Sequence, residues 1–214
     1  MIKIDLHTHS ILSHDGSIDE QDYKQAFDKG ILSYVAITDH DRIEYAQFLQ
    51  KKFGERIIVG EEMYAKEGHI IGLFLQKTIA SGQSTVDTIA AIKEQGGLVY
   101  IPHPFDVRRK GIGEGALLKI SNSIDILEVF NGRILVQEHN KKAKLFAQKY
   151  NLTLGVGSDA HCRNGLGTNY SELTEAPTKE NLVSLLRKGM VRGEQMALVH
   201  FLCPKINKLK KMFI

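Results

Sequence analysis

The sequence lacks the features that would place it in several specialised classes of protein. It has two cysteines, Cys162 and Cys203, too few for a disulfide framework and suited to a reducing compartment. No apolar run reaches the ~18 residues that a membrane-spanning helix needs, and the first residues lack the charged and apolar regions of a signal peptide. We therefore expect a cytoplasmic protein with no stable membrane association.

Strong charge of one sign and internal repetition are also missing. The 28 Lys and Arg residues nearly balance the 25 Asp and Glu residues, which leaves a formal net charge of +3. That balance is too mild to argue by itself for a nucleic-acid or membrane partner. With no repeat, low-complexity stretch or linker, we expect one domain over residues 1–195 and a basic tail over residues 196–214 that packs on it.

The sequence does have polar residues where apolar runs end. Ile2 and Ile4 predict a buried first strand, and His7 and His9 follow at its end. Residues i and i+2 of a strand point to the same side, so the two imidazoles would face one direction, as ligands of a divalent metal do. Such a pair also occurs by chance on exposed strands, so its weight depends on similar strand ends elsewhere.

Further apolar runs end in the same way. We expect strands near residues 34–38, 57–59, 69–75, 98–101, 124–130 and 152–156, and helices near 18–29, 135–150 and 178–188, with one more ending at Gly54 and one from Thr85 to Gly96. The polar residues at the strand ends and in one turn are His14, Asp15, His40, Glu62, His69, His103, Asp159 and His161. Alternating strands and helices with polar carboxyl ends indicate a parallel barrel or open sheet with its site on one face.

Two of the strands lie too close in sequence for a helix to connect them, and they predict a hairpin. A hairpin centred between Ala65 and Lys66 would place Glu62 opposite His69, with their Cβ atoms ~5 Å apart. One metal ion could then bind both side chains. The nitrogen and oxygen ligands together exceed the three or four that one tetrahedral zinc takes, and they fit two or three metals that share carboxylates.

In order and spacing these motifs resemble those of the polymerase and histidinol phosphatase (PHP) superfamily, from residue 2 to about residue 190. The motifs are Asp5-Leu6-His7-Thr8-His9-Ser10, Ile37-Thr38-Asp39-His40-Asp41, Gly60-Glu61-Glu62, His69, Pro102-His103-Pro104, Glu128-Val129-Phe130-Asn131 and Gly157-Ser158-Asp159-Ala160-His161. The resemblance implies an α/β fold, a distorted seven-stranded (β/α)7 TIM-like barrel with its metal site at the C-terminal ends of the strands. It also implies two or three divalent ions, Mn, Fe or Zn, and phosphoester hydrolysis.

Carried onto this sequence, the resemblance implies three overlapping ligand sets. One metal would take His7, His9, Glu62 and Asp159, a second Glu62, His69 and His103, and a third His14 or Asp15 with His40 and His161. Glu62 rather than Glu61 matches the bridging glutamate of the family. At Ser13-His14-Asp15-Gly16 the chain departs from the commonest short-member pattern, in which aspartate directly follows the serine. His14 and Asp15 therefore both stay candidates.

The predicted activity is that of a metal-dependent phosphoesterase. Paired metals ~3.5–4 Å apart lower the pKa of a shared water and clamp the attacking and leaving oxygens. We predict that a metal-bridging hydroxide attacks phosphorus, with Asp159, His161 and His40 near the phosphate. The substrate would be a small phosphomonoester or a nucleotide or oligonucleotide end, and no obligate protein partner is evident. The alternatives are a metal-dependent amidohydrolase, whose barrels also begin with His-x-His, and a noncatalytic metal-binding or regulatory module.

Several residues have two interpretations. Arg133 could bind the phosphate bidentately or be a surface arginine, and the run Arg108-Arg109-Lys110 could steer an anion or simply be solvated. Asp5 and Asp39 stand beside the histidines, where a carboxylate orients an imidazole or pairs locally. Cys162 borders His161 but is expected to be a bystander.

Overall fold

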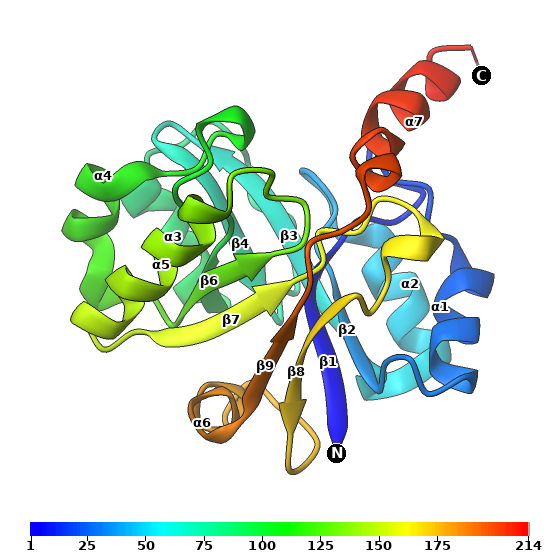
Figure 1. The fold of residues 1–214 in the computed structure, drawn as a ribbon, viewed down its shortest axis with the longest axis horizontal. Helices are drawn as coiled ribbons and strands as arrows, with labels where there is room; N and C mark the ends of the chain where they lie inside the picture. The colour runs from blue at the N-terminus through cyan, green and yellow to red at the C-terminus, as the bar shows by residue number, and fades with distance from the viewer. Residues whose placement is uncertain (214) are drawn as a thin grey trace.

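The apolar runs form a single curved sheet of nine strands in a computed structural model, which describes residues 1–213 (Figure 1). The strands are β1 (Ile2–Thr8), β2 (Tyr34–Ile37), β3 (Ile57–Ala65), β4 (Gly68–Leu73), β5 (Leu98–Ile101), β6 (Ile126–Asn131), β7 (Thr153–Gly157), β8 (Asn169–Leu173) and β9 (Met190–Gly193). Their order across the sheet is β7-β6-β5-β4-β3-β2-β1-β8-β9.

The sheet curves until the end of β7 returns to β1, which nearly closes it into a barrel. The Asp159 N–H donates to the His7 carbonyl at 2.8 Å, and the His9 N–H donates to the Ala160 carbonyl at 2.8 Å. Among the described residues, one parallel bridge, Thr8 with Ala160, joins the end of β1 to the segment after β7. This contact brings the ends of the first and seventh strands together.

The predicted (β/α)7 barrel is wrong in the number of strands, because the sheet has nine, and the predicted hairpin interrupts its parallel order. β1, β2 and β3 are parallel, as are β5, β6 and β7, but β4 runs antiparallel to both of its neighbours. The physical reason is the short turn between β3 and β4, which leaves no room for the crossover that parallel strands need. β8 and β9 add two more antiparallel pairings beside β1.

The predicted hairpin of β3 and β4 is present, but its register differs by two residues. Glu62 pairs with Ile71, and His69 pairs with Tyr64. Because side chains alternate between faces with a period of two, a shift of two residues leaves Glu62 and His69 on the same face. The two side chains therefore still meet.

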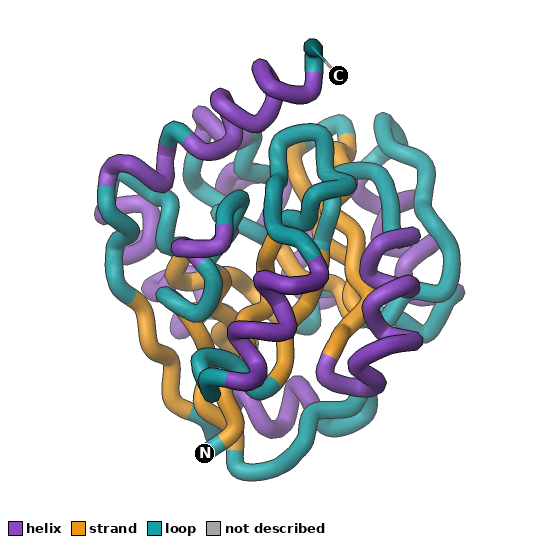
Figure 2. The backbone as a smooth tube through the Cα atoms, turned by 90° about the vertical axis from the view of Figure 1, so that its right-hand side faces the viewer, coloured by secondary structure: helices purple, strands orange, loops and turns teal. Residues whose placement is uncertain are grey.

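Helices surround the sheet, except α7, which extends away from it above the strand ends (Figures 1 and 2). They are α1 (Glu20–Asp28), α2 (Glu44–Phe53), α3 (Thr85–Glu94), α4 (Gly113–Ile120), α5 (Gln137–Lys149), α6 (Leu182–Lys188) and α7 (Cys203–Lys211). α1 begins at a capping box in which Asp19 and Asp22 each accept the other's backbone N–H. Within residues 1–213, no helix combines the length and apolar character needed to cross a bilayer.

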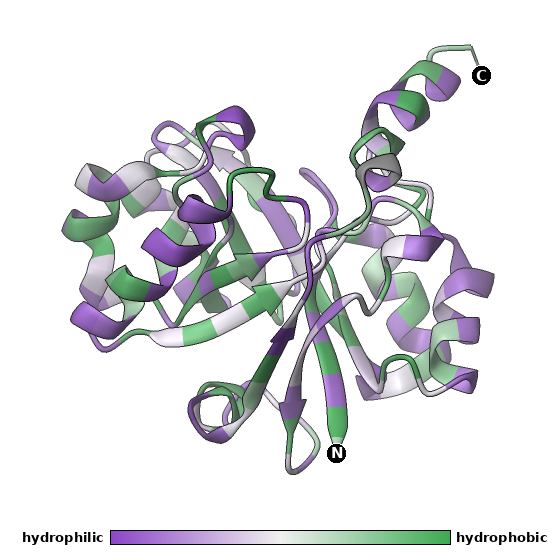
Figure 3. Ribbon diagram, in the orientation of Figure 1, coloured by the Kyte–Doolittle hydropathy of each residue, from purple (hydrophilic) through white to green (hydrophobic). Residues whose placement is uncertain are grey.

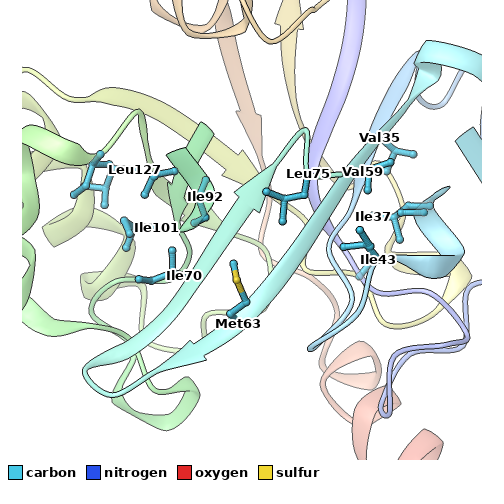
Figure 4. Packing of buried hydrophobic residues seen from close by; sticks show 14 of the residues in the cluster. Val35, Ile37, Ile43, Val59, Met63, Ile70, Leu75, Ile92, Ile101 and Leu127 are labelled. Carbon is cyan, nitrogen blue, oxygen red and sulfur yellow. The ribbon is translucent and has the colours of Figure 1, made fainter. Parts of the chain in front are cut away.

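Apolar side chains fill the space between the sheet and the helices. Figure 4 shows Ile43 at the start of α2 packed near Val35 and Val59, and Ile92 of α3 near Ile101. Hydrophobic and hydrophilic residues alternate along the helices (Figure 3), and in α1 the buried ones are Tyr23, Ala26 and Phe27. Burial of each such side chain contributes about 1.5–3 kcal/mol, so these contacts hold the strand ends in place.

Gly157, the last residue of β7, lies where no side chain fits. A Cβ at this position would collide with the His7 Cβ and the Glu128 Oε1. The absence of a side chain therefore lets the end of β7 approach the end of β1. In contrast, Gly115 of α4 has open space where a Cβ would lie.

We expect Gly157→Ala to destabilise the protein by about 1–3 kcal/mol, because overpacking forces buried neighbours to move. Gly115→Ala is the matched control, and we expect it to raise stability by about 0.5–1 kcal/mol because alanine restricts the unfolded chain. Urea unfolding of both variants measures the difference. Equal stability of Gly157→Ala and the natural protein would contradict this account of the seam between β1 and β7.

Candidate metal centre

Glu62, in β3, is the residue on which most of the predicted ligands converge. Its carboxylate is buried, and its two oxygens face different imidazoles. Oε1 lies 2.7 Å from His69 Nδ1 and 3.1 Å from His103 Nε2. Oε2 lies within 3.5 Å of a ring nitrogen of three more histidines, His7, His9 and His40. One carboxylate thus connects side chains from four strand ends.

His7 and His9 converge as their spacing predicts. Their Nε2 atoms lie 3.1 Å apart, and Asp159 Oδ1 lies 3.8 Å from the first and 3.5 Å from the second. Both rings are fully buried. Together with Glu62, His69 and His103 they surround one compact space, and we call His7, Glu62, His69, His103 and Asp159 the inner group.

A second set of side chains lies beside the inner group. Asp15 Oδ2 is 3.2 Å from His161 Nε2 and 3.7 Å from His40 Nε2, and the rings of His9 and His161 have centroids 4.2 Å apart. Each of the four residues offers one donor atom within 4.8 Å of the others. We call His9, Asp15, His40 and His161 the outer group.

The structure separates two pairs of neighbouring candidates. Asp15 lies within the outer group, whereas the His14 side chain is 56% exposed and lies at its rim, with its Nε2 3.9 Å from Asp15 Oδ2 and its ring centroid 4.9 Å from that of His40. Glu61 is turned away from the cluster, where its carboxylate accepts the Ile79 N–H at 2.9 Å. Burial raises the pKa of Glu61 to about 7. Glu62 alone of the two glutamates faces the histidines.

Glu128 orients the inner group, a role that the sequence motif did not reveal. Its Oε1 lies 3.0 Å from His7 Nδ1 and accepts a hydrogen bond from the Tyr100 hydroxyl at 2.7 Å. Its Oε2 accepts a hydrogen bond from the backbone N–H of His103 at 2.6 Å. A neutral imidazole carries one N–H, so donation to Glu128 leaves the Nε2 lone pair of His7 directed toward Glu62. Such a carboxylate behind a histidine is common in metal sites.

Asp5 and Asp39 make local contacts with the backbone rather than with an imidazole ring. Asp5 accepts the N–H groups of His7 at 3.3 Å and Ser158 at 3.0 Å. Asp39 accepts the N–H of Ser10 at 2.6 Å and also its hydroxyl. Of the two interpretations open from the sequence, local pairing is the one that these contacts match.

Two arginines contact Asp159. Arg109 donates to its Oδ2 at 2.5 Å and to the Asn131 side chain at 2.8 Å, and Arg133 donates to its Oδ1 at 3.1 Å. Arg133 also lies 2.9 Å from His161 Nδ1. The sequence drew attention to Arg133 but left Arg109 within a solvated basic run, because nothing in that run indicates which of its residues turns inward.

The pKa values of the cluster reflect a high density of opposite charges. Burial by itself would raise the pKa of Glu62, but the surrounding imidazoles, His40 first among them, hold it well below its usual range. Burial would lower the pKa of His9, but Asp159 and Glu62 raise it to about 9. His161 goes the other way, because burial and then Arg133 lower its pKa to about 3.

The donor set fits divalent ions. Imidazole nitrogens and carboxylate oxygens suit zinc, manganese and iron. Four groups of three or four such residues, all from the inner and outer groups, bring their donor atoms within 4.8 Å of one another. In addition, the Nε2 atoms of His7 and His9 face each other and the carboxylates of Glu62 and Asp159. A metal cation or an added proton between these atoms would offset the negative charge of the carboxylates. The residues therefore fit a site for divalent metal.

The cluster opens into a cavity of about 480 Å³. Its walls include Glu62, His69, His103, Asp159 and His161 from the cluster. They also include six cationic residues, Arg108, Arg109, Lys110, Arg133, Lys205 and Lys208. The last two come from α7, so the C-terminal segment forms part of the wall.

The two cysteines, which we did not expect to pair, form a disulfide. Cys162 directly follows His161, and Cys203 is the first residue of α7. Their Cα atoms lie 6.2 Å apart, within the usual range for a disulfide. The sequence concealed this pairing because 41 residues separate the two positions.

Comparison with known proteins agrees with this geometry. The chain is 34% identical over 180 residues to an uncharacterized protein of Methanocaldococcus jannaschii, with 81% of this chain and 71% of that protein covered. A second uncharacterized protein of the same organism is 40% identical over 144 residues, covering 61% of this chain and 82% of the relative. The model of the family described as PHP-associated matches residues 137–191.

Solved structures share the fold at lower identity. A two-domain protein from Bacteroides vulgatus that contains a predicted PHP-like metal-dependent phosphoesterase has a TM-score of 0.73 and 19% identity, over 97% of this chain and 69% of that one. An amidohydrolase from Chromobacterium violaceum with bound sulfate has a TM-score of 0.63 and 17% identity, over 88% of this chain and 97% of that one. A lesion-specific endonuclease from Pyrococcus furiosus has a TM-score of 0.61 and 15% identity, over 89% of this chain and 57% of that one. The motifs, the family model and these likenesses together show that the chain belongs to the PHP superfamily.

Proposed function

We propose that this protein is a metal-dependent phosphoesterase that hydrolyses a small phosphomonoester or a phosphoester at a nucleotide or oligonucleotide end. The observation that carries the proposal is Glu62, whose two oxygens face five imidazoles at the floor of a cation-lined cavity. The inner group and the outer group would hold two or three divalent ions. When bound, such ions activate water and stabilise the charge that develops on phosphoryl oxygens.

The protein's own residues would prepare the site in three ways. Glu128 fixes the tautomer and the ring orientation of His7, and Tyr100 holds Glu128 in turn. Asp159 and the histidines supply ligands from buried positions, where little water competes. Arg133 lines the cavity next to Asp159 and His161, so its guanidinium would contact phosphate oxygens bound there. His40 and His161 lie beside the same space.

The charge of the cavity favours a phosphoester over an amide. Six cationic side chains line it. They attract an anionic phosphate electrostatically, whereas a neutral amide has no net charge for them to attract. The amidohydrolase with the same fold binds sulfate, an anion of similar shape to phosphate. Its name keeps amide hydrolysis as the second candidate. Hydrolysis assays with manganese, iron or zinc on mononucleotides, short oligonucleotides, sugar phosphates and amides test both, and amide turnover without phosphoester turnover would reject the proposal.

The neighbouring glutamates provide a matched pair of variants. We expect Glu62→Gln to lose bound metal and to lower kcat/KM at least ~100-fold, since one carboxylate serves both groups of ligands. Glu61→Gln, which alters a buried carboxylate on the other face of the strand, should keep both properties within about threefold. Mass spectrometry of bound metal and steady-state kinetics provide the measurements. Equal metal content in the two variants would contradict the assignment of Glu62.

Arg133→Ala should raise KM for a phosphoester by roughly 10- to 100-fold, because it removes charge-assisted hydrogen bonds to the phosphate. Bound metal should stay unchanged, which separates substrate binding from metal binding. Arg192→Ala, on β9 and outside the cavity lining, is the control and should have the natural KM. An unchanged KM for Arg133→Ala would show that this arginine does not contact the substrate.

Metal binding should strengthen as pH rises. The His9 pKa of about 9 lies above the ordinary value of 6.5, so at pH 7 a proton occupies the site that a metal needs. Raising the pH from 6 to 9 removes that competition, and the apparent metal affinity should increase by up to about tenfold per pH unit for each displaced proton. Above pH 9 the increase should level off. Chelator competition at several pH values measures it, and a constant affinity would contradict the prediction.

A further inference from the structure

The C-terminal helix α7 contacts two of the chain segments that carry the outer group, those of Asp15 and His161. Asn207 is buried on this helix, with 7% of its surface exposed. Its side-chain Nδ2 donates to the Asp15 carbonyl at 2.9 Å and to the His161 carbonyl at 2.9 Å. One amide therefore joins two turns that are distant in sequence. Each of those turns supplies a side chain to the outer group.

Lys211 encloses the first of these turns. Its ammonium donates to the carbonyls of Ile11, Ser13 and Gly16, at 2.5, 2.5 and 2.8 Å. These three acceptors surround the position of Asp15. The turn is thus held from within by the Ser13 hydroxyl, which donates to Asp15 Oδ1 at 2.9 Å, and from outside by α7.

Pro204 is the buried apolar residue of α7, and its other apolar side chains are largely exposed. Ile206, Leu209 and Met212 are 47%, 59% and 77% exposed, so hydrophobic packing contributes little to the position of the helix. Figure 1 shows α7 extending away from the sheet above the strand ends. Asn207, Lys211 and the Cys162–Cys203 disulfide are the contacts that fix it, and all three lead to residues next to Asp15 or His161.

We propose that α7 completes the outer metal subsite, with Asn207 as a positioning residue that fixes the distance between Asp15 and His161 together with Ser17, whose N–H and hydroxyl also donate to the His161 carbonyl, each at 3.0 Å. This rests on the proposed function only in that the outer group holds a metal ion. Asp15 Oδ2 and His161 Nε2 lie 3.2 Å apart, so a shift of either turn would separate two ligands of one ion. Neighbours that orient ligands in this way affect metal affinity without touching the metal.

The disulfide makes this arrangement depend on thiol redox state. Exchange of the two thiols with a low-molecular-weight disulfide, RSSR, forms the Cys162–Cys203 bond and releases two RSH. Reduction reverses the exchange and frees the start of α7 from the residue beside His161. Binding at the outer subsite should therefore be tighter in the oxidised protein than in the reduced protein.

The experiment titrates the full chain with manganese or zinc alone and measures each dissociation constant by chelator competition. We expect Asn207→Leu, which keeps the size of the side chain but removes both donors, to weaken the weakest-bound ion by 10- to 100-fold and to leave tighter ions unchanged. Lys210→Ala on the same helix, exposed and without a contact to the two turns among the described hydrogen bonds, is the matched control and should stay within twofold.

A second variant and a second readout keep the test independent of helix stability. Cys162→Ser combined with Cys203→Ser should weaken the same ion in the same direction. Hydrogen exchange of metal-free protein should become faster in residues 11–17 of Asn207→Leu. If Asn207→Leu lowers the melting temperature but leaves every metal constant unchanged, the helix only stabilises the fold and the inference is wrong. No metal binding by the natural protein would also overturn it.

These outcomes are separate from the test of the proposed function, because no substrate is used. A protein that loses its weakest ion in Asn207→Leu but hydrolyses no phosphoester would keep this inference and reject the phosphoesterase proposal. If the natural protein hydrolyses a phosphoester and the metal dissociation constants are unchanged in Asn207→Leu and in the cysteine variant, the phosphoesterase proposal is kept and this inference is rejected.

Discussion

The rest of the site depends on one carboxylate placed among imidazoles. Glu62 in a dry interior would be costly to ionise by itself, yet five histidine rings surround it and its pKa is held low. The fold maintains this concentration of polar groups by burying apolar side chains below and around it. Because the candidate ligands come from β1, β3, β4 and the segments after β1, β2, β5 and β7, most of the sheet must be in place before the charges offset one another.

Much of the site could be predicted from the sequence because its signals are local. The spacing of His7 and His9 fixes their common direction in a strand, and apolar runs mark where strands end. The same reasoning tolerated an error in the hairpin, since a two-residue shift changes the partner of His69 but not its face. Local patterns therefore identified which residues gather, without locating them exactly opposite one another.

The remaining features depend on contacts between distant segments. The antiparallel direction of β4 followed from the short turn before it, but the two strands β8 and β9 were missed, because their pairing beside β1 depends on segments far apart in the sequence. β9 is exposed along its whole length, so its sequence lacks the alternation of buried and exposed residues that predicts a strand. The inward turn of Arg109, the hydrogen bonds of Glu128 and the pairing of Cys162 with Cys203 likewise arise only once the chain has folded.

The meeting of β1 and β7 has a mechanical consequence. The chain just after β7 is joined to the end of β1 there by a single bridge, Thr8 with Ala160, instead of a full ladder of hydrogen bonds. His7 stands on one side of this narrow joint and Asp159 on the other. A metal ion bound by both residues would link the ends of β1 and β7. Without the ion, we expect the barrel to open first between these two strands.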